Sequence, residues 1–345
     1  GFDYFYGMSA SLDMSPYVYI EQDRFTQIPH TKVSSRKGKE FYREGPIADN
    51  FVHEEVLDHF TSRAQDYIKA HKDSPFFLYF PLTAPHTPIL PDEKFKGTSH
   101  TNEYGDFVLH CDDVVGRIMK TLEELSLLED TIVIFTSDNG CSYQAGFDEL
   151  LKCGHNPNYH FRGSKSDIFE GGHRVPLIIQ YPKSIPVHTT SHSTVCLGDF
   201  FATIADYLNI PIADTEGEDS VSLKVILDGV ESAKVRDNIV HQSIDGSLSL
   251  RSQQWKLEMC PGSGGWSYPA SGSEDEKQLP KIQLYNLEKD IGEKNNVADL
   301  YPLIVGEMIQ ALTTIILQGR STRGVPQENN GSPVWETVQW LKEAL

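Results

Sequence analysis

The chain has 345 residues, 39% of them hydrophobic, which is enough to bury the core of one large domain or of two unequal domains. Its 49 acidic residues outnumber its 30 lysines and arginines, and the net charge of −19 argues against nonspecific nucleic-acid binding, which requires a basic surface. No apolar run approaches the ~18 residues of a membrane-spanning helix, so the sequence predicts no membrane span.

The first third of the chain predicts an irregular segment, a helix and a strand. Residues 1–43 are rich in Tyr, Pro and polar side chains and are expected to form loops with short extended pieces. A helix with an Asp-Asn cap is expected over 49–71, because apolar side chains recur there at helical spacing. The apolar run 75–80 predicts a fully buried strand, and it leads to His86, which flanking prolines hold in stiff, extended backbone.

A second helix and a second strand repeat this order. Apolar residues across 104–125 step by three and four, which predicts a helix with one buried face. Residues 131–136 predict another buried strand. The four residues that follow, Ser137-Asp138-Asn139-Gly140, contain no apolar side chain. The order helix, strand, loop, helix, strand, loop is typical of a doubly wound α/β fold, in which the chemistry lies past the carboxyl ends of the strands.

The Asp138-Asn139 pair offers two adjacent oxygen donors, which suit Ca²⁺ or Mg²⁺. The two side chains can converge on one ion only if the backbone turns, and we expect the conformational freedom of Gly140 to permit that turn. The alternative interpretation is an Asx-turn that simply ends the strand. These residues alone leave both interpretations open.

The rest of the chain predicts a polar loop, a further strand and helix, and then a region of short strands and loops. Residues 141–165 read as a polar loop, 177–181 as a buried strand and 199–208 as a helix. After about residue 230, short strands and loops predict a small α+β domain with an antiparallel sheet. Its expected strands are 238–242, 247–250, 254–259 and 282–286, and its expected helix is 303–317.

His86, the Asp138-Asn139 pair, Lys165 and the Gly171-Gly172 turn form a candidate constellation. A cation and Lys165 would offset negative charge on the oxygens of a tetrahedral oxyanion during displacement. His86 could protonate the leaving alcohol, because histidine changes charge near neutral pH. Taken singly, His86 also fits a packed loop histidine and Lys165 a surface lysine. No Ser, Cys or Thr lies in a setting typical of an activated nucleophile.

Six segments of the chain resemble the type I sulfatases, the formylglycine-dependent arylsulfatases of the alkaline-phosphatase-like superfamily. They are GFDYFYG (1–7), PFFLYFPLTAPHTP (75–88), YGDFVLHCDDVVGRIMKTLEEL (104–125), TIVIFTSDNG (131–140), FRGSKSDIFEGGHRVP (161–176) and LYNLEKDIGEKNNVAD (284–299). The segments follow the family's order, and TSDNG followed downstream by EGGHRVP is highly specific. The resemblance is greatest to the arylsulfatase A and N-acetylgalactosamine-6-sulfatase branch.

The resemblance implies roles for particular residues. Asp138 and Asn139 would be ligands of a Ca²⁺ ion, or of Mg²⁺ in its place. His86 and Lys165 would contact the sulfate group and its bridging oxygen. We also consider His155, Arg162 and His173 as candidates to bind the sugar of an oligosaccharide or small-molecule sulfate ester.

One motif of the family does not occur in the chain. The family's nucleophile is a cysteine in C-x-P-S-R that is oxidised to formylglycine, and the five cysteines here continue as CDDVV, CSYQA, CGHNP, CLGDF and CPGSG. The resemblance therefore leads us to expect a sulfatase that lacks its first hundred-odd residues. The nucleophile and half of the metal site would belong to that segment, and the chain alone would be inactive.

We predict an alkaline-phosphatase-like α/β fold, with a mixed, mostly parallel sheet between helices in residues 1–230. This part would be the C-terminal portion of a sulfatase catalytic domain, and residues 231–345 would form an antiparallel α+β subdomain. The intact protein is expected to hydrolyse a sulfate ester of a carbohydrate or aryl alcohol in a secreted, periplasmic or lysosomal location. Two alternatives stay open: a phosphomonoester or phosphonate hydrolase of the same superfamily, and a non-catalytic protein that binds sulfated glycans.

Overall fold

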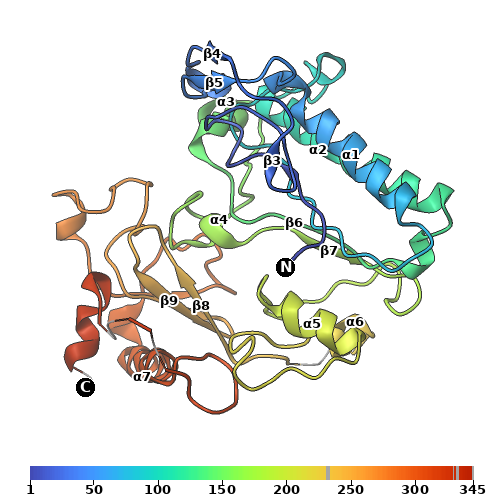
Figure 1. Cartoon of the computed structure of the whole chain (residues 1–345). Coiled ribbons are helices and arrows are strands. Elements are labelled where there is room, and N and C mark those ends of the chain that lie inside the picture. The colour runs from blue at the N-terminus through green and yellow to red at the C-terminus, as the bar shows by residue number, and fades with distance from the viewer. Residues whose placement is uncertain (231–233, 329, 332–333, 344–345) are drawn as a thin grey trace. The chain divides into compact units, whose positions relative to one another are not determined.

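The computed structural model describes residues 1–230, 234–328, 330–331 and 334–343. The chain divides into two compact units: unit 1 holds residues 1–132 and 142–157, and unit 2 holds residues 133–141 and 158–345 (Figure 1). The chain therefore passes between the units three times. The predicted domain boundary at 230/231 falls beside residues 231–233, which lie outside the described residues, and it stays a prediction.

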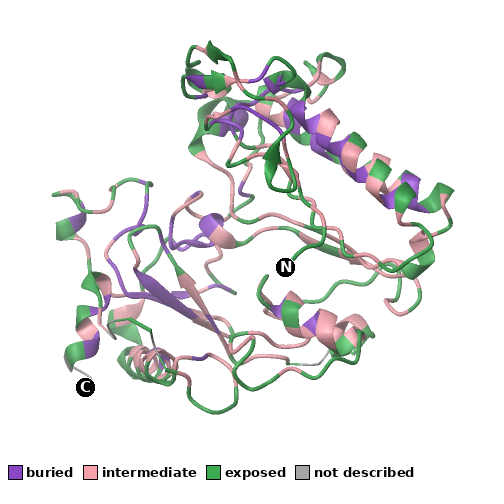
Figure 2. Cartoon of the chain, viewed as in Figure 1, coloured by how far each residue is buried: buried purple, intermediate pink, exposed green. Residues whose placement is uncertain are grey.

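Two long helices, α1 (Val56–Ala70) and α2 (Glu103–Glu124), pack against each other in unit 1 (Figure 1). Both lie where the sequence predicts them, and each buries one stripe of side chains (Figure 2). The predicted cap of the first helix is wrong, because α1 begins at Val56, after a short turn of 3-10 helix. The second helix is capped by Asn102, whose side chain accepts hydrogen bonds from the first turn.

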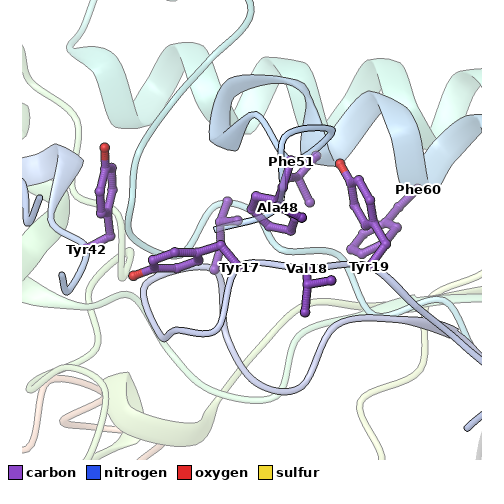
Figure 3. Packing of buried hydrophobic residues seen from close by; sticks show 9 residues of the cluster. Tyr17, Val18, Tyr19, Tyr42, Ala48, Phe51 and Phe60 are labelled. Atoms are coloured by element: carbon purple, nitrogen blue, oxygen red, sulfur yellow. The ribbon is translucent and has the colours of Figure 1, made fainter. Parts of the chain in front are cut away.

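The N-terminal segment of unit 1 is irregular, as predicted, and is held by an aromatic core. Its short strands are β1 (Tyr6–Gly7), β2 (Ile20–Glu21), β3 (Arg24–Phe25), β4 (Thr31–Val33) and β5 (Gly45–Ile47). Figure 3 shows Tyr17 and Tyr19 with Phe51 and Phe60 in this core. The Tyr17 hydroxyl is satisfied by donating to the Arg43 carbonyl oxygen at 2.6 Å. Large apolar side chains thus tie the loops to α1.

The predicted buried strand at 75–80 is wrong. The segment is extended, but it belongs to none of the strands in the described part of the chain. Phe77 and Tyr79 are 62% and 69% exposed, whereas Phe76, Leu78 and Phe80 are partly buried. The physical reason is that a strand needs a neighbour to pair its backbone groups, and an apolar run does not supply one.

Unit 2 contains a two-stranded antiparallel ribbon of β6 (Val133–Thr136) and β7 (Leu177–Gln180). Both strands occur where they are predicted, but they are not fully buried, since the paired side chains of Phe135 and Ile178 are 37% and 62% exposed. Every pair of named strands among the described residues is antiparallel. The expected parallel sheet is therefore not observed there, and the described residues form one isolated parallel bridge, between Tyr17 and Ile47.

The C-terminal part of unit 2 is a four-stranded antiparallel sheet in the order β11-β10-β9-β8, as predicted. Its strands are β8 (Asn238–Gln242), β9 (Leu248–Ser252), β10 (Trp255–Glu258) and β11 (Gln283–Asn286). Helix α7 (Pro302–Gln318) covers one face, where Leu250, Leu257 and Leu284 pack with Leu312. The opposite face carries polar side chains, and several of them are buried as well.

The remaining helices are α3 (Phe147–Lys152), α4 (Glu170–His173), α5 (Asp199–Tyr207) and α6 (Lys224–Leu227). Helix α5 confirms the prediction for 199–208, whereas α3 interrupts a stretch that was expected to be loop. Mixed helices and sheets with an antiparallel C-terminal sheet confirm the predicted α/β class. No helix in the described residues is long and apolar enough to cross a membrane.

Candidate functional site

Residues 137–140 form the loop that follows β6, and we call this segment the Asp138 loop. Hydrogen bonds join it and the end of β6 to the turn before β7. The Gly140 N–H donates to the Gly172 carbonyl oxygen at 2.9 Å, and the Thr136 hydroxyl donates to the Pro176 carbonyl oxygen at 2.8 Å. The two motifs TSDNG and EGGHRVP, which are far apart in the sequence, therefore form one structural element.

Glycine is required in this element because backbone segments approach closely. A Cβ atom on Gly140 would lie 1.8 Å from the Gly171 carbonyl oxygen. A Cβ atom on Gly172 would lie 2.2 Å from the Asp167 carbonyl oxygen. Gly140 is not among the glycines with positive φ, so close approach, rather than the conformational freedom expected from the sequence, explains it.

Asp138 and Asn139 present oxygen atoms that fit a hard cation. The Asp138 carboxylate is exposed and makes no hydrogen bond or ion pair within the described residues. The Asn139 amide donates from Nδ2 to the Gly140 carbonyl oxygen at 3.1 Å, which leaves its Oδ1 available as a ligand. Among the described residues no group of three or more His, Cys, Asp or Glu could hold a metal. The pair thus fits part of a Ca²⁺ site, since Ca²⁺ takes about six to eight oxygens.

Lys165 is carried by a segment that is hydrogen-bonded to the end of the Asp138 loop. Its N–H donates to the Cys141 carbonyl oxygen at 3.0 Å, and the Asn158 side chain bridges Cys141 and Gly163. The Lys165 side chain is partly buried, and its ammonium group makes no hydrogen bond or ion pair to the described residues. The backbone is therefore fixed while the cation is left available.

Asp167 connects this segment to the Gly-rich loop at 262–266. Its carboxylate accepts hydrogen bonds from the N–H groups of Ser164 at 2.7 Å and Trp266 at 2.9 Å. A Cβ atom on Gly265 would lie 2.6 Å from the Ser166 carbonyl oxygen, so the two loops are in close contact. This places the GSGGW loop against the turn that carries Lys165.

A cluster of ionisable side chains joins the first residue of α4 to the C-terminal sheet. It consists of Glu170, Arg251, Lys256, Glu258 and Glu293, and we call it the Lys256 cluster. The Lys256 Nζ lies 2.8 Å from Glu293 Oε1 and 3.2 Å from Glu170 Oε1. The Glu170 N–H donates to Glu293 Oε2 at 2.7 Å. Arg251 Nη1 lies 3.3 Å from Glu170 Oε2. These contacts join α4, the polar face of the sheet and the loop after β11.

Protonation within the Lys256 cluster follows from burial and neighbouring charge. Burial would lower the pKa of Lys256, but Glu293 and Glu170 outweigh it and raise that pKa. Burial would raise the pKa of Glu170, yet Lys256 and Arg251 lower it to about 2. Burial and the adjacent Glu293 raise the pKa of Glu258 well above its ordinary range.

The structure uses His173 and Arg162, the two sugar-binding candidates in unit 2, for packing. The His173 ring stacks on His241 with 3.7 Å between centroids. Its Nε2 lies 3.1 Å from the Lys256 Nζ and accepts the hydrogen bond, because an ammonium group only donates. Arg162 donates to the Glu293 carbonyl oxygen at 2.8 Å. Sugar binding by either side chain stays a prediction, and these contacts lend it no support.

His86 and His155 belong to unit 1, and both are exposed. His86 Nδ1 lies 2.6 Å from the Thr87 carbonyl oxygen. A carbonyl oxygen only accepts, so Nδ1 carries the proton and Nε2 is the nitrogen that can meet a ligand. The His155 ring makes no hydrogen bond to the described residues, and its role stays a prediction.

Reasoning from the sequence missed the Lys256 cluster. Lys256 and Glu258 flank Leu257 in a strand, a pattern that usually indicates one solvated face. One signal was available: Glu170 and Glu293 both lie in segments that carry the family resemblance, yet neither was given a role.

Comparison with known proteins gives the chain a family. A model described as Sulfatase matches residues 1–210. The N-acetylgalactosamine-6-O-sulfatase of Bacteroides thetaiotaomicron is 33% identical over 269 residues, which cover 76% of this chain and 51% of that protein. The N-acetylgalactosamine-6-sulfatase of Sus scrofa is 29% identical and covers 96% of this chain and 65% of that protein. The chain thus spans about half to two thirds of the length of these relatives.

A solved structure agrees with this match. It comes from work on the metabolism of multiple glycosaminoglycans by Bacteroides thetaiotaomicron and has a TM-score of 0.77 at 28% identity. The similarity covers 91% of this chain and 72% of that one.

Replacing Gly140 by alanine should disrupt the joined loops. The added Cβ would meet the Gly171 carbonyl oxygen, which cannot move without shifting the turn. We expect Gly140→Ala to lower the free energy of unfolding by about 1–3 kcal/mol, as overpacking does, in urea denaturation. The control is Gly306→Ala in α7, where a Cβ meets nothing within 4 Å and stability should hold or rise by up to ~1 kcal/mol. Equal stability of the two variants would contradict the prediction.

Acidification should destabilise unit 2 through the stacked histidines. Burial and the charge of Lys256 lower the pKa of His241 from 6.5 to about 3, and burial with His241 lowers that of His173 well below 6.5. Only the unfolded chain takes up these protons below pH 6.5, so stability is full above that pH and falls as the pH drops toward 3. Each histidine contributes up to about 1.4 kcal/mol per pH unit.

The measurement is thermal melting of the wild type and of His241→Gln between pH 7 and pH 4. The variant should lose less melting temperature per pH unit, because one of the linked protons is gone. His155→Gln, at an exposed position, should follow the wild type. Parallel losses in wild type and His241→Gln would rule out this origin of the acid sensitivity.

Proposed function

Because the chain belongs to the sulfatase family, we propose that it forms part of an enzyme that hydrolyses sulfate esters of carbohydrates. The observation that carries the proposal is the joined pair of motifs, in which Gly140 on the Asp138 loop is hydrogen-bonded to Gly172. It presents free oxygen donors and a free ammonium group from one unit. Displacement at a tetrahedral oxyanion needs positive charge near its oxygens, which a metal ion on the oxygen ligands and the ammonium group would supply. The sulfatase family indicates that this oxyanion is sulfate.

Asp138 and Asn139 would hold the metal in this proposal. Their oxygens suit Ca²⁺, with Mg²⁺ as the other hard cation of this class. Such an ion, when bound, offsets the negative charge of sulfate oxygens. Formylglycine, which the family implies as the nucleophile, has no motif cysteine among the five in this chain.

Lys165 would bind the sulfate group as a second cation. Its backbone is fixed to Cys141, and its ammonium group has no partner in the described residues. A preorganised donor needs little rearrangement when charge develops on the leaving oxygen. Asp167 keeps the turn in place through its hydrogen bonds to Ser164 and Trp266.

His86 would deliver a proton to the leaving alcohol from Nε2. Because Nδ1 already donates to the Thr87 carbonyl oxygen, a proton on Nε2 makes the ring a cation. The cationic form is both a better acid and a better partner for an anionic ester. The Thr87 contact therefore orients the ring for this role.

The relatives point to the substrate class. Both relatives described above are sulfatases that act on the 6-sulfate of N-acetylgalactosamine by name. We propose a sulfated amino sugar in an oligosaccharide as the substrate here, and export to the periplasm, the cell exterior or a lysosome as the location.

Substituting His86 or Lys165 should slow catalysis in an active sulfatase that contains this chain. We expect His86→Ala and Lys165→Ala each to lower kcat about 10²–10⁴-fold, the scale of general acid and electrostatic catalysis. The assay is turnover of an aryl sulfate and of a 6-sulfated amino sugar. Lys277→Ala, an exposed lysine paired with Glu274, is the control and should be unchanged. Near wild-type turnover in both site variants would refute the assigned roles.

One comparison of substrates separates sulfate chemistry from the phosphate alternative. The same sugar is offered to the active protein as its sulfate ester and as its phosphate ester. We expect the sulfate ester to be hydrolysed faster. Preference for the phosphate ester would favour a phosphomonoesterase, and binding without turnover of either would favour a glycan-binding protein.

A further inference from the structure

A cavity of about 320 Å³ lies in unit 2, and none of its lining residues belongs to the Asp138 loop. It is lined by residues 192–194, residues 234–238, Arg251 and Gln253. Three lining side chains are cations, namely Lys234, Arg236 and Arg251, and one, Asp237, is an acid. In a chain with a net charge of −19, an anionic ligand needs such a local concentration of positive charge.

Two of these cations keep unused donors. The Arg236 side chain is 5% exposed and pairs with Asp199, yet its buried Nε has no hydrogen-bond partner. Arg251 uses Nη1 for Glu170 at 3.3 Å and Nε for the Gln253 carbonyl oxygen at 3.4 Å. Its Nη2 makes no hydrogen bond to the described residues. Each guanidinium thus keeps one charged N–H donor, the kind of group that binds the oxygens of sulfate and carboxylate groups.

Each of the three cations that line the cavity is paired with one acid. Lys234 pairs with Asp237, and Arg236 pairs with Asp199. Arg251 shares its carboxylate partner, Glu170, with Arg174 and with Lys256, which is also paired with Glu293. Arg251 therefore faces the cavity with charge that its partner does not fully cancel.

The cavity is connected to the candidate active site through Arg251. Arg251 pairs with Glu170, which begins the turn that ends at His173. In that turn, Gly172 accepts the hydrogen bond from Gly140 of the Asp138 loop. A sulfated glycan carries repeated anionic groups along its length, whereas a small ester carries one. A second anion site on the same unit therefore matches an oligosaccharide.

We propose that this cavity is a subsite for a second anionic group, a sulfate or a uronate carboxylate, of an acidic oligosaccharide. The inference rests on the proposed function, since it takes a sulfated carbohydrate as the substrate. His192, Lys234 and Gln253 are exposed, so the cavity is open to a ligand that continues beyond it.

The test measures binding to the full chain by calorimetry. The probes are a chondroitin 6-sulfate hexasaccharide, the unsulfated chondroitin hexasaccharide and neutral maltohexaose. Lys234→Glu should weaken binding of the sulfated probe about tenfold, and Lys234→Ala about threefold, because a lost or reversed charge acts through a partly solvated site. Both variants should melt like the wild type, since the Lys234 side chain is 53% exposed.

The matched control is Lys277→Glu. Lys277 is 59% exposed and pairs with an acid three residues away, as Lys234 does, but it does not line the cavity. Its affinity for the sulfated probe should stay unchanged. If Lys234→Glu also weakens binding of unsulfated chondroitin, the cavity takes the carboxylate, and if only the sulfated probe is affected, it takes the sulfate. Equal affinities of Lys234→Glu and Lys277→Glu, or equal binding of maltohexaose, would overturn the proposal.

Two outcomes separate this inference from the proposed function. If Lys165→Ala weakens binding of the sulfated probe and Lys234→Glu does not, the subsite is wrong while the sulfatase proposal stands. If Lys234→Glu weakens binding but an enzyme containing this chain hydrolyses no sulfate ester, the sulfatase proposal fails and the cavity remains a site for acidic glycans.

Discussion

The burial of one ammonium group, that of Lys256, determines how unit 2 is assembled. Its side chain is 0% exposed, and an unpaired charge in that position would cost several kcal/mol. Glu170 and Glu293 supply the compensating charge, and the Ile168 carbonyl oxygen accepts a further hydrogen bond at 2.8 Å. These partners lie on the turn before β7 and in the loop after β11. If either segment moved away, the buried charge of Lys256 would lose one of its two closest carboxylate partners.

The candidate site depends on this constraint through the backbone. Glu170 begins the turn whose Gly172 holds Gly140, and Gly140 ends the loop that presents Asp138 and Asn139. The C-terminal sheet thus supports residues that the chain places well before it in the sequence. Both faces of this sheet are covered. Helix α7 packs on the apolar face, and residues 167–174 pack on the polar face, which is therefore shielded from solvent. The Lys256 cluster thus supports the candidate site through the backbone, and one of its members, Arg251, also lines the cavity in unit 2.

Most of the secondary structure is predictable from the sequence, because helical periodicity and short apolar runs are local properties. The strands around Val240, Leu250, Leu257 and Leu284 lie within one or two residues of their predicted positions. The segment 75–80 is the informative failure. Its apolar composition is typical of a buried strand, but pairing depends on a neighbour that no local pattern encodes. Residue type and position made the Asp138 loop and Lys165 candidates, and the order of several family motifs favoured them over a simple turn and a surface lysine.

The sequence by itself determined the fold class and the family and selected the residues that we propose to carry chemistry, since each depends on residue type and order. Only the tertiary structure decided why Gly140 must be glycine and which charges are buried. Gly140 owes its identity to the carbonyl oxygen of Gly171, a residue distant in the chain. Lys256 and Glu258 alternate with Leu257 as solvated residues would, and their burial arises from segments that pack on them from elsewhere. Burial and close approach are properties of pairs of distant segments, so a pattern read along one segment cannot contain them.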